Sequence, residues 1–234
     1  MINNYINHNE ENFMSRTAFG INFLVTLIFC FSSVACAATD NLAVKITPEL
    51  GEVKVKHEGD TVVIRREQDQ KATVNQDFAK TSRKCPPFCI QPIELAPGVE
   101  TIGEVEMLNY LDRLHNKGDD SILVVDSRTP GWVKKGTIPG SVNIPWTKLN
   151  PAKGADPLTM SIIMEKQFGA KQIEAGIWDF SSVRTLVMFC NGMWCGQSPA
   201  NIKQLLKMGY PAHKIKWYRG GMQNWSNLGF TTVK

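Results

Sequence analysis

Runs of basic residues are absent from this chain: no stretch holds four or more consecutive Lys or Arg residues, and the formal net charge is only +4. Proteins that bind nucleic acid through its phosphates usually carry such a run or a basic patch, so we expect no nucleic-acid partner. Internal repeats and low-complexity segments are absent as well. Their absence argues against a repeat architecture and favours an ordinary folded domain.

Charged residues are also missing from residues 17–39, whose middle is almost wholly apolar. Arg16 precedes this stretch and small residues end it. This order is typical of a secretory signal peptide with cleavage after Ala37 or Ala38. We therefore expect residues 1–37 to be a signal peptide and the mature protein to be exported, to the periplasm or otherwise outside the cytoplasm.

Two alternatives stay open for this segment. The apolar run is long enough for an uncleaved membrane anchor, and only then would the protein contact a membrane. A lipoprotein signal around Cys36 fits less well, because Ser33 stands where a leucine is expected. The start of translation is open too, since Met14 would give a more typical signal than Met1 with its polar leader.

After the signal, the sequence divides into an appendage with a linker at residues 38–97 and a domain at residues 98–234. Apolar alternation over residues 53–56 and 61–66 indicates two strands around a turn at residues 57–60. The resulting β-hairpin is too short to bury a core of its own, so we expect an appendage and not an independent domain.

Strands and helices alternate along the second part of the chain. Strands are expected over residues 122–125, 141–144, 185–190 and 215–218, and helices from Thr101 and over residues 160–169, 199–208 and 222–228. This alternation predicts an α/β fold in which a parallel sheet has helices on both faces.

Capping residues indicate where two of these helices begin. Thr101 and Glu104 form a capping box ahead of an apolar stripe of Val105, Leu108, Leu111 and Leu114. Ser198 is expected as the N-cap of the helix over residues 199–208, with Pro199 at its first position.

An apolar strand ends on Cys190, and a short loop leads from this cysteine to the helix after Ser198. A thiol that faces a helix N-terminus lies where backbone N–H groups and the helix dipole favour negative charge. Such a position lowers the pKa of a cysteine and makes its thiolate available as a nucleophile. The alternative is a buried, inert cysteine that only fills the core.

Four cysteines remain after the predicted signal, in the close pairs Cys85/Cys89 and Cys190/Cys195. In an oxidising compartment such pairs can cycle between dithiol and disulfide. Cys85 and Cys89 lie in a Pro-rich joint, where they form a structural disulfide, act as a second redox pair or stay reduced. The spacings are poor for a four-cysteine zinc site, so we expect no metal and no cofactor.

Four motifs between about Thr101 and Lys234 resemble those of a rhodanese (sulfurtransferase) domain. They are the strand ending in Asp-x-Arg at residues 124–128, the Gly-x-Ile-Pro-Gly segment at residues 136–145, Phe189-Cys190 at the start of the active loop, and the closing Gly-Gly-x-x-x-Trp at residues 220–225. Each motif is weak alone, but the four in this order and spacing are specific.

The resemblance implies a rhodanese-like α/β fold in which Cys190 takes sulfane sulfur from a small donor as a persulfide and passes it to a thiol or protein acceptor. It implies that backbone N–H groups of the loop hold the extra sulfur. The loop comprises Asn191, Gly192, Met193, Trp194, Cys195, Gly196, Gln197 and Ser198. Asp126 and Arg128 would support neighbouring loops, and Pro139, Gly140, Gly220 and Gly221 would shape the backbone.

The loop departs from the family pattern in length and charge. It is longer than usual, and no Lys or Arg occurs between Arg184 and Lys203. We therefore expect it to hold a dianion such as thiosulfate less well. The lack of Cys-x5-Arg also argues against the phosphatases that share this fold. Thr137 replaces the usual His, with little expected effect on the mechanism.

Cys195 leaves several functions open. The first is a sulfurtransferase that uses a Cys190 persulfide, with thiosulfate, a polysulfide or a persulfide as donor. If Cys195 attacks that persulfide or resolves an oxidised Cys190, the chain is a thiol–disulfide oxidoreductase. Cys195 can also pack beside Trp194 without reacting. A third function is that of a non-catalytic binding module whose hairpin docks a partner.

Overall fold

The structure, a computed structural model, describes residues 42–234. The predicted signal peptide and its alternatives, an anchor, a lipoprotein signal at Cys36 and a start at Met14, lie outside these residues. No helix in the described part is long and apolar enough to cross a membrane.

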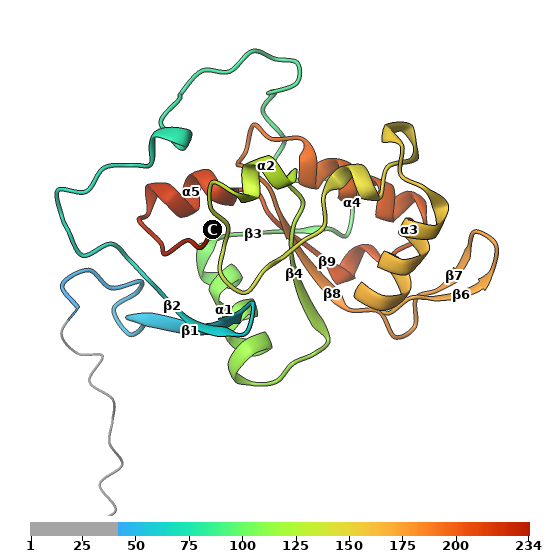
Figure 1. The fold of residues 1–234 in the computed structure, drawn as a ribbon, viewed down its shortest axis with the longest axis horizontal. Helices are drawn as coiled ribbons and strands as arrows, with labels where there is room; N and C mark the ends of the chain where they lie inside the picture. The colour runs from blue at the N-terminus through green and yellow to red at the C-terminus, as the bar shows by residue number, and fades with distance from the viewer. Residues whose placement is uncertain (1–41) are drawn as a thin grey trace, which may run out of the picture. The chain divides into compact units, whose positions relative to one another are not determined.

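A five-stranded sheet with the strand order β3-β9-β8-β4-β5 lies at the centre of the fold (Figure 1). Its strands are β3 (Glu100–Ile102), β4 (Ile122–Asp126), β5 (Val142–Asn143), β8 (Thr185–Phe189) and β9 (Ile215–Tyr218). Every neighbouring pair is parallel, so the predicted parallel sheet is confirmed. β4 is buried along its whole length, which accounts for its continuous apolar sequence.

Helices cover both faces of this sheet. One face packs against α1 (Glu104–Asn116) and α5 (Gly221–Asn227). The other packs against α4 (Gln197–Lys207) and the π-helical turn η4 (Ile163–Gln167), which continues α3 (Pro157–Ile162). Because successive residues of a strand point to opposite faces, Val124 of β4 belongs to the first core and Val125 to the second.

The predicted N-terminal hairpin is confirmed and packs onto the sheet domain. β1 (Glu52–His57) and β2 (Asp60–Arg65) pair antiparallel around residues 58–59. Val55 and Ile64 from these strands lie in the same core as α1 and α5. The hairpin therefore completes the core of the domain instead of standing apart from it.

Several other short elements contain too few residues to produce a periodic pattern, and the sequence does not predict them. Besides β3, they are α2 (Pro130–Val133), β6 (Lys171–Glu174), β7 (Ile177–Asp179) and the 3-10 turns η1 (Gln76–Phe78), η2 (Trp146–Lys148), η3 (Pro151–Lys153) and η5 (Ala212–Lys214). β6 and β7 form a second antiparallel hairpin outside the central sheet.

The capping box expected at Thr101 and Glu104 is wrong. Thr101 lies in β3, and α1 begins at Glu104 with Gly103 as its N-cap. The side chain of Glu106 accepts a hydrogen bond from the N–H of Gly103 at 3.0 Å. The helix starts later because pairing with β9 holds the preceding residues in a strand. Val105, expected in the apolar stripe, is 43% exposed.

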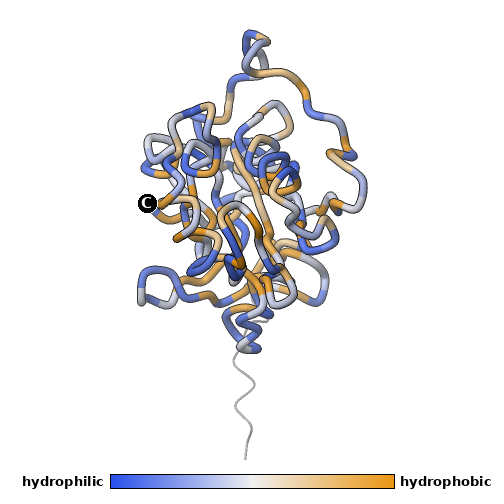
Figure 2. Tube along the Cα trace, turned by 90° about the vertical axis from the view of Figure 1, so that its right-hand side faces the viewer, coloured by the Kyte–Doolittle hydropathy of each residue, from blue (hydrophilic) through white to orange (hydrophobic). Residues whose placement is uncertain are grey.

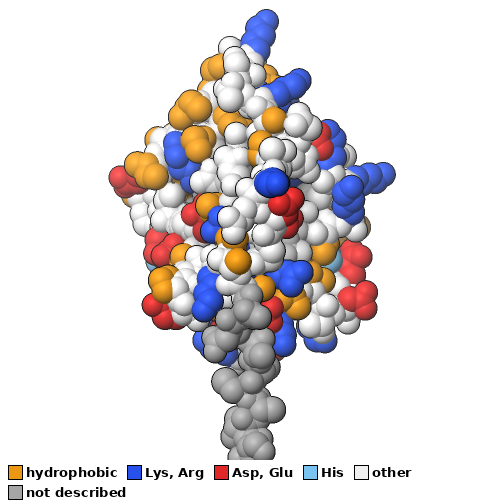
Figure 3. All heavy atoms as spheres, turned by 90° about the vertical axis from the view of Figure 1, so that its left-hand side faces the viewer, with side chains coloured by type: hydrophobic (Ala, Val, Ile, Leu, Met, Phe, Trp, Pro, Cys, Tyr) orange, Lys and Arg blue, Asp and Glu red, His pale blue; other side chains and the backbone are white. Residues whose placement is uncertain are grey.

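Hydrophobic residues concentrate in the interior, and charged residues of both signs lie on the surface. Figure 2 shows hydrophobic residues concentrated along the central strands. Figure 3 shows basic and acidic side chains interspersed on one face of the molecule.

We predict that Ile64→Ala lowers the free energy of unfolding of the whole domain by about 2–5 kcal/mol, the usual cost of truncating a buried isoleucine. Ile64 is 0% exposed in the shared core, whereas Ile173, the matched control, is 65% exposed. Ile173→Ala should change stability by less than about 0.5 kcal/mol. Denaturant unfolding checks both variants, and a main transition unchanged by Ile64→Ala would show that the hairpin folds separately.

Candidate functional site

Cys190 follows β8 directly, at the carboxyl edge of the parallel sheet. The loop after it leads to α4, which begins at Gln197 with Gly196 as N-cap. The predicted N-cap at Ser198 is therefore wrong: Ser198 is the second residue of the helix and Pro199 the third. The helix begins earlier because the carbonyl oxygen of Gly196 accepts its first hydrogen bond, from the N–H of Ala200 at 2.9 Å.

The Ser198 hydroxyl faces the thiol of Cys190 instead of capping the helix. It donates a hydrogen bond to the Sγ atom of Cys190 at 3.1 Å and accepts one from the indole N–H of Trp217 at 3.1 Å. An indole N–H can only donate, so the oxygen of Ser198 is the acceptor in its bond with Trp217. The hydrogen of the Ser198 hydroxyl therefore points to the sulfur of Cys190. When Cys190 is neutral, its thiol can donate to the carbonyl oxygen of Cys195 at 3.5 Å.

Opposing effects set the pKa values of the two loop cysteines. Cys190 is 2% exposed, and burial alone would raise the pKa of its thiol. Hydrogen bonds from the Cys195 thiol, the Ser198 hydroxyl and the N–H groups of Ser198 and Gly192 outweigh burial and lower this pKa to about 7. Burial and the adjacent Cys190 raise the pKa of Cys195 far above its usual range. Cys190 is therefore the thiolate of the pair and Cys195 the hydrogen-bond donor.

The first turn of α5 fixes the backbone of the loop by close contact. The N–H of Met222 donates to the carbonyl oxygen of Cys190 at 3.0 Å, and that of Gln223 donates to Asn191 at 2.9 Å. Gly221 has a φ of +53°, and a Cβ atom on it would overlap the carbonyl oxygen of Cys190. Only glycine permits this approach.

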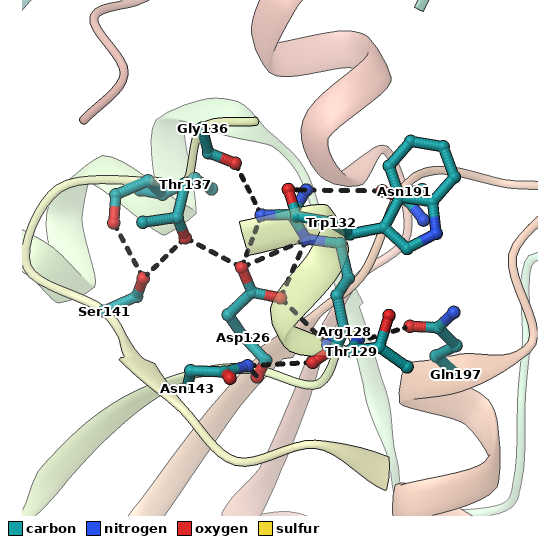
Figure 4. A network of polar contacts seen from close by, with 11 residues as sticks. Asp126, Arg128, Thr129, Trp132, Gly136, Thr137, Ser141, Asn143, Asn191 and Gln197 are labelled. Atoms are coloured by element: carbon teal, nitrogen blue, oxygen red, sulfur yellow. Dashed lines mark hydrogen bonds and ion pairs between the residues drawn. The ribbon is translucent and has the colours of Figure 1, made fainter. Parts of the chain in front are cut away.

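A buried ion pair joins the loop to the end of β4 (Figure 4). Nη2 and Nε of Arg128 contact the carboxylate of Asp126 at 2.6 and 2.9 Å. Arg128 also donates to Oδ1 of Asn191 at 3.3 Å and to the carbonyl oxygen of Gly136 at 2.7 Å. The hydroxyl of Thr137 donates to Asp126 at 2.7 Å. Thr137, for which little effect on the mechanism was expected, thus completes this hydrogen-bond network.

The remaining loop residues are held by contacts with two other segments and by packing within the loop. The side chain of Gln197 accepts a hydrogen bond from the N–H of Thr129 at 3.2 Å. The indole N–H of Trp194 donates to the side chain of Gln223. Met193 packs against the cluster formed by Cys190, Trp194 and Cys195.

A segment of the connection between β2 and β3 covers the reactive loop, and this connection passes above α2 in the view of Figure 1. Cys85 and Cys89 are joined by a disulfide bond. Phe88, inside this small ring, packs against the same cysteine cluster, and its ring lies edge-on to Trp194 with centroids 5.5 Å apart.

Polar contacts hold the covering segment in place. The N–H of Gln91 donates to the carbonyl oxygen of Met193 at 2.8 Å, and Arg219 donates to the carbonyl oxygen of Gln91 at 2.8 Å. The guanidinium of Arg83 lies 4.2 Å from the ring centroid of Trp194. Arg83 and Phe88 are site residues that the sequence does not predict, because no local pattern indicates a contact between segments so far apart in the chain.

The arrangement offers a thiolate near neutral pH, surrounded by N–H, O–H and S–H donors that can stabilise negative charge on sulfur. Within residues 42–234, no group of three or more His, Cys, Asp or Glu side chains is placed to hold a metal ion.

A family model described as a rhodanese-like domain matches residues 107–228. No curated protein sequence matches the chain. The similar solved structures include a human single-domain sulfurtransferase, which is 20% identical over 54% of this chain and 95% of its own, with a TM-score of 0.35.

Two further structures are similar at the same level. A thiosulfate sulfurtransferase from Pseudomonas aeruginosa is 15% identical over 60% of this chain and 21% of its own, with a TM-score of 0.38. A protein of unknown function from Rhodopseudomonas palustris, described as a possible tyrosine phosphatase, is 20% identical over 58% of this chain and 85% of its own, with a TM-score of 0.37. With TM-scores below 0.5, these structures carry no argument about activity.

We predict that Cys195→Ala raises the pKa of Cys190 and that Cys195→Ser leaves it near 7. Alanine removes the donor to the thiolate, whereas serine keeps one. A hydrogen bond to a charged group contributes about 1.5–3 kcal/mol, so the midpoint should move to higher pH by about 1 unit or more. The ultraviolet absorbance of the thiolate, followed against pH, gives the midpoint of the Cys190 titration in each variant. A midpoint that stays near 7 in Cys195→Ala would show that Cys195 does not lower this pKa.

Gly221→Ala should destabilise the protein more than Gly118→Ala does. Both glycines have positive φ, +53° and +65°, but a Cβ atom on Gly118 meets nothing within 4 Å. Gly118→Ala therefore costs only the backbone term of about 1–2 kcal/mol, and Gly221→Ala adds the clash with Cys190. Free energies of unfolding from denaturant titration compare the two, and equal losses would refute the close-approach argument.

Proposed function

Because the chain belongs to the rhodanese-like domain family, we propose that it is a sulfurtransferase that carries sulfane sulfur as a persulfide on Cys190. The observation that carries the proposal is the set of hydrogen bonds that converge on the buried sulfur of Cys190, from the Ser198 hydroxyl at 3.1 Å and from backbone N–H groups of the loop, which lower the pKa of this thiol. We propose further that the protein acts after export, with a small sulfur compound as donor and a thiol or protein thiol as acceptor.

In the first step, the Cys190 thiolate attacks the sulfane sulfur of the donor. The donor's bond to that sulfur breaks, its electron pair leaves with the rest of the donor, and the persulfide Cys190–S–S⁻ forms. In the second step, an acceptor thiolate attacks the outer sulfur. Cys190 then leaves as a thiolate, which the N–H groups of Gly192 and Ser198 and the hydroxyl of Ser198 stabilise.

A second candidate function is thiol–disulfide exchange between Cys190 and Cys195. Their proximity favours it, because the thiol of Cys195 hydrogen-bonds the sulfur of Cys190. Attack of a Cys195 thiolate on the persulfide would release hydrosulfide and leave a Cys190–Cys195 disulfide. The raised pKa of Cys195 opposes this attack, because the attacking group must be a thiolate. We therefore favour sulfur transfer, with Cys195 as hydrogen-bond donor.

The intact mass of the purified protein, exposed to thiosulfate or polysulfide after mild reduction, tests the two functions. We expect a gain of one sulfur atom in the wild type and in Cys195→Ser, but none in Cys190→Ser. A loss of two hydrogen atoms without sulfur gain, blocked by either substitution, would instead identify a Cys190–Cys195 disulfide switch. Neither mass change in the wild type would contradict both functions and favour a non-catalytic module.

A further inference from the structure

Trp217 of β9 is buried next to the reactive loop, although it belongs to none of the four motifs that indicated the site. Parallel pairing places it opposite Met188 of β8, two residues before Cys190. Because successive residues of a strand point to opposite faces, its side chain lies in the core that packs against α4, whereas that of Tyr218 lies in the other core. The indole is 1% exposed, and its N–H donates to the hydroxyl oxygen of Ser198 at 3.1 Å. The sheet thus reaches the hydroxyl that faces the thiol.

The hydroxyl of Ser198 has one hydrogen and two acceptor positions, and it can rotate. In a helix such a hydroxyl often donates to the backbone carbonyl three or four residues earlier, here that of Cys195 or Trp194. It could also accept a hydrogen bond from the neighbouring thiol, which would favour the neutral form of Cys190. Of these orientations, only the one that directs the hydrogen at the sulfur stabilises the thiolate.

A tryptophan fixes this orientation, because its N–H donates and its ring has no hydrogen-bond acceptor. A tyrosine or a histidine in the same place could accept the hydrogen of Ser198 and draw it away from the sulfur. The indole instead occupies an acceptor position of the oxygen and polarises the hydroxyl as a donor. The hydrogen bonds run from Trp217 to Ser198 and from Ser198 to Cys190, each at 3.1 Å. Their common direction is set by the tryptophan.

We propose that Trp217 is a positioning residue for sulfur transfer: it holds the Ser198 hydroxyl in the orientation that donates to Cys190, and so favours release of the transferred sulfur to the acceptor. Trp217 acts through Ser198, since its N–H bonds the hydroxyl and not the sulfur. The proposal rests on the sulfur-transfer function proposed above, but the two hydrogen bonds are the same whichever donor or acceptor the protein uses.

The orientation of the hydroxyl matters most in the second step of the reaction. In the persulfide, the negative charge lies on the outer sulfur, and Sγ of Cys190 is an uncharged, weak acceptor. When an acceptor thiolate attacks the outer sulfur, the bond between the two sulfur atoms breaks. Its electron pair passes to Sγ, and the acceptor keeps the outer sulfur as its own persulfide. The hydrogen bond from Ser198 strengthens as charge develops on Sγ, which lowers the barrier of this step.

In the first step the same hydrogen bond stabilises the reactant. It raises the fraction of Cys190 that is thiolate at neutral pH, but it lowers the reactivity of each thiolate. At a pH that ionises Cys190 in every variant, loss of the bond should therefore not slow persulfide formation. Slower persulfide consumption with unimpaired formation at high pH is the signature of the positioning role, whereas a general disturbance of the loop would slow both steps.

Trp217→Phe removes the N–H and tests the role. We expect it to raise the pKa of Cys190 by about half a unit to one unit, which corresponds to the loss of one hydrogen bond. After loading with polysulfide and removal of the excess, its persulfide should pass to glutathione about threefold to tenfold more slowly than that of the wild type. Thiolate absorbance gives the pKa, and intact mass follows the persulfide. In a Ser198→Ala background, Trp217→Phe should change neither quantity.

Trp178→Phe is the matched control, because Trp178 of β7 packs against the same core as Trp217. It should keep the pKa and the transfer rate of the wild type. If the smaller ring disturbs the core at position 217, replacement of Trp217 by 3-benzothienylalanine, which keeps the shape of the indole but lacks the N–H, should give the changes expected for Trp217→Phe.

The outcomes separate the positioning role from the function. A pKa and a transfer rate in Trp217→Phe equal to those of Trp178→Phe, or the same losses with and without the Ser198 hydroxyl, would overturn the role of Trp217 even if Cys190 forms a persulfide. A raised pKa in Trp217→Phe without persulfide formation from any donor would support the orientation of the hydroxyl and refute sulfur transfer.

Discussion

The buried ion pair of Asp126 and Arg128 is the interaction on which the geometry of the site depends. Burying two charges costs several kcal/mol per ion unless their hydrogen-bonding groups are matched. Here the pair also binds Asn191, the carbonyl oxygen of Gly136 and the hydroxyl of Thr137. Since these partners come from different segments, the charges are matched only when the end of β4 and the reactive loop are both in place. The penalty for burial therefore selects one loop geometry.

Within this geometry, uncharged donors stabilise the thiolate. No Lys or Arg lies between Arg184 and Lys203, and the hydrogen bonds to Cys190 come from N–H groups, the Ser198 hydroxyl and the Cys195 thiol. Such donors can offset the free-energy cost of burying one negative charge on sulfur. They stabilise a second negative charge less than a guanidinium does. The basic group that the loop lacks is found beside it, where the guanidinium of Arg83 lies against the ring of Trp194.

Much of the fold could be predicted from the sequence, because β4 and β8 are continuous apolar runs and α4 has the apolar spacing of a helix. Cys190 was a candidate for the same reason, since it ends a clear strand. Ser198 was misplaced as a cap because local rules cannot show that its hydroxyl lies between Trp217 and the thiol. The Cys85–Cys89 segment could not be placed at all. Its contacts join positions about a hundred residues apart, and no local periodicity encodes them.

That distant segment places Phe88 against the cluster of Cys190, Trp194 and Cys195. The entropy of closing a chain segment rises only slowly with its length, so a covering segment can come from far outside the matched domain. The Cys85–Cys89 ring reduces the freedom of the segment further. Cys190 and its hydrogen-bond donors must keep their positions for the thiolate to form, whereas Phe88 only packs against the cluster of Cys190, Trp194 and Cys195. Changes in the covering segment should therefore alter the packing around the reactive thiol without removing the hydrogen bonds that lower its pKa.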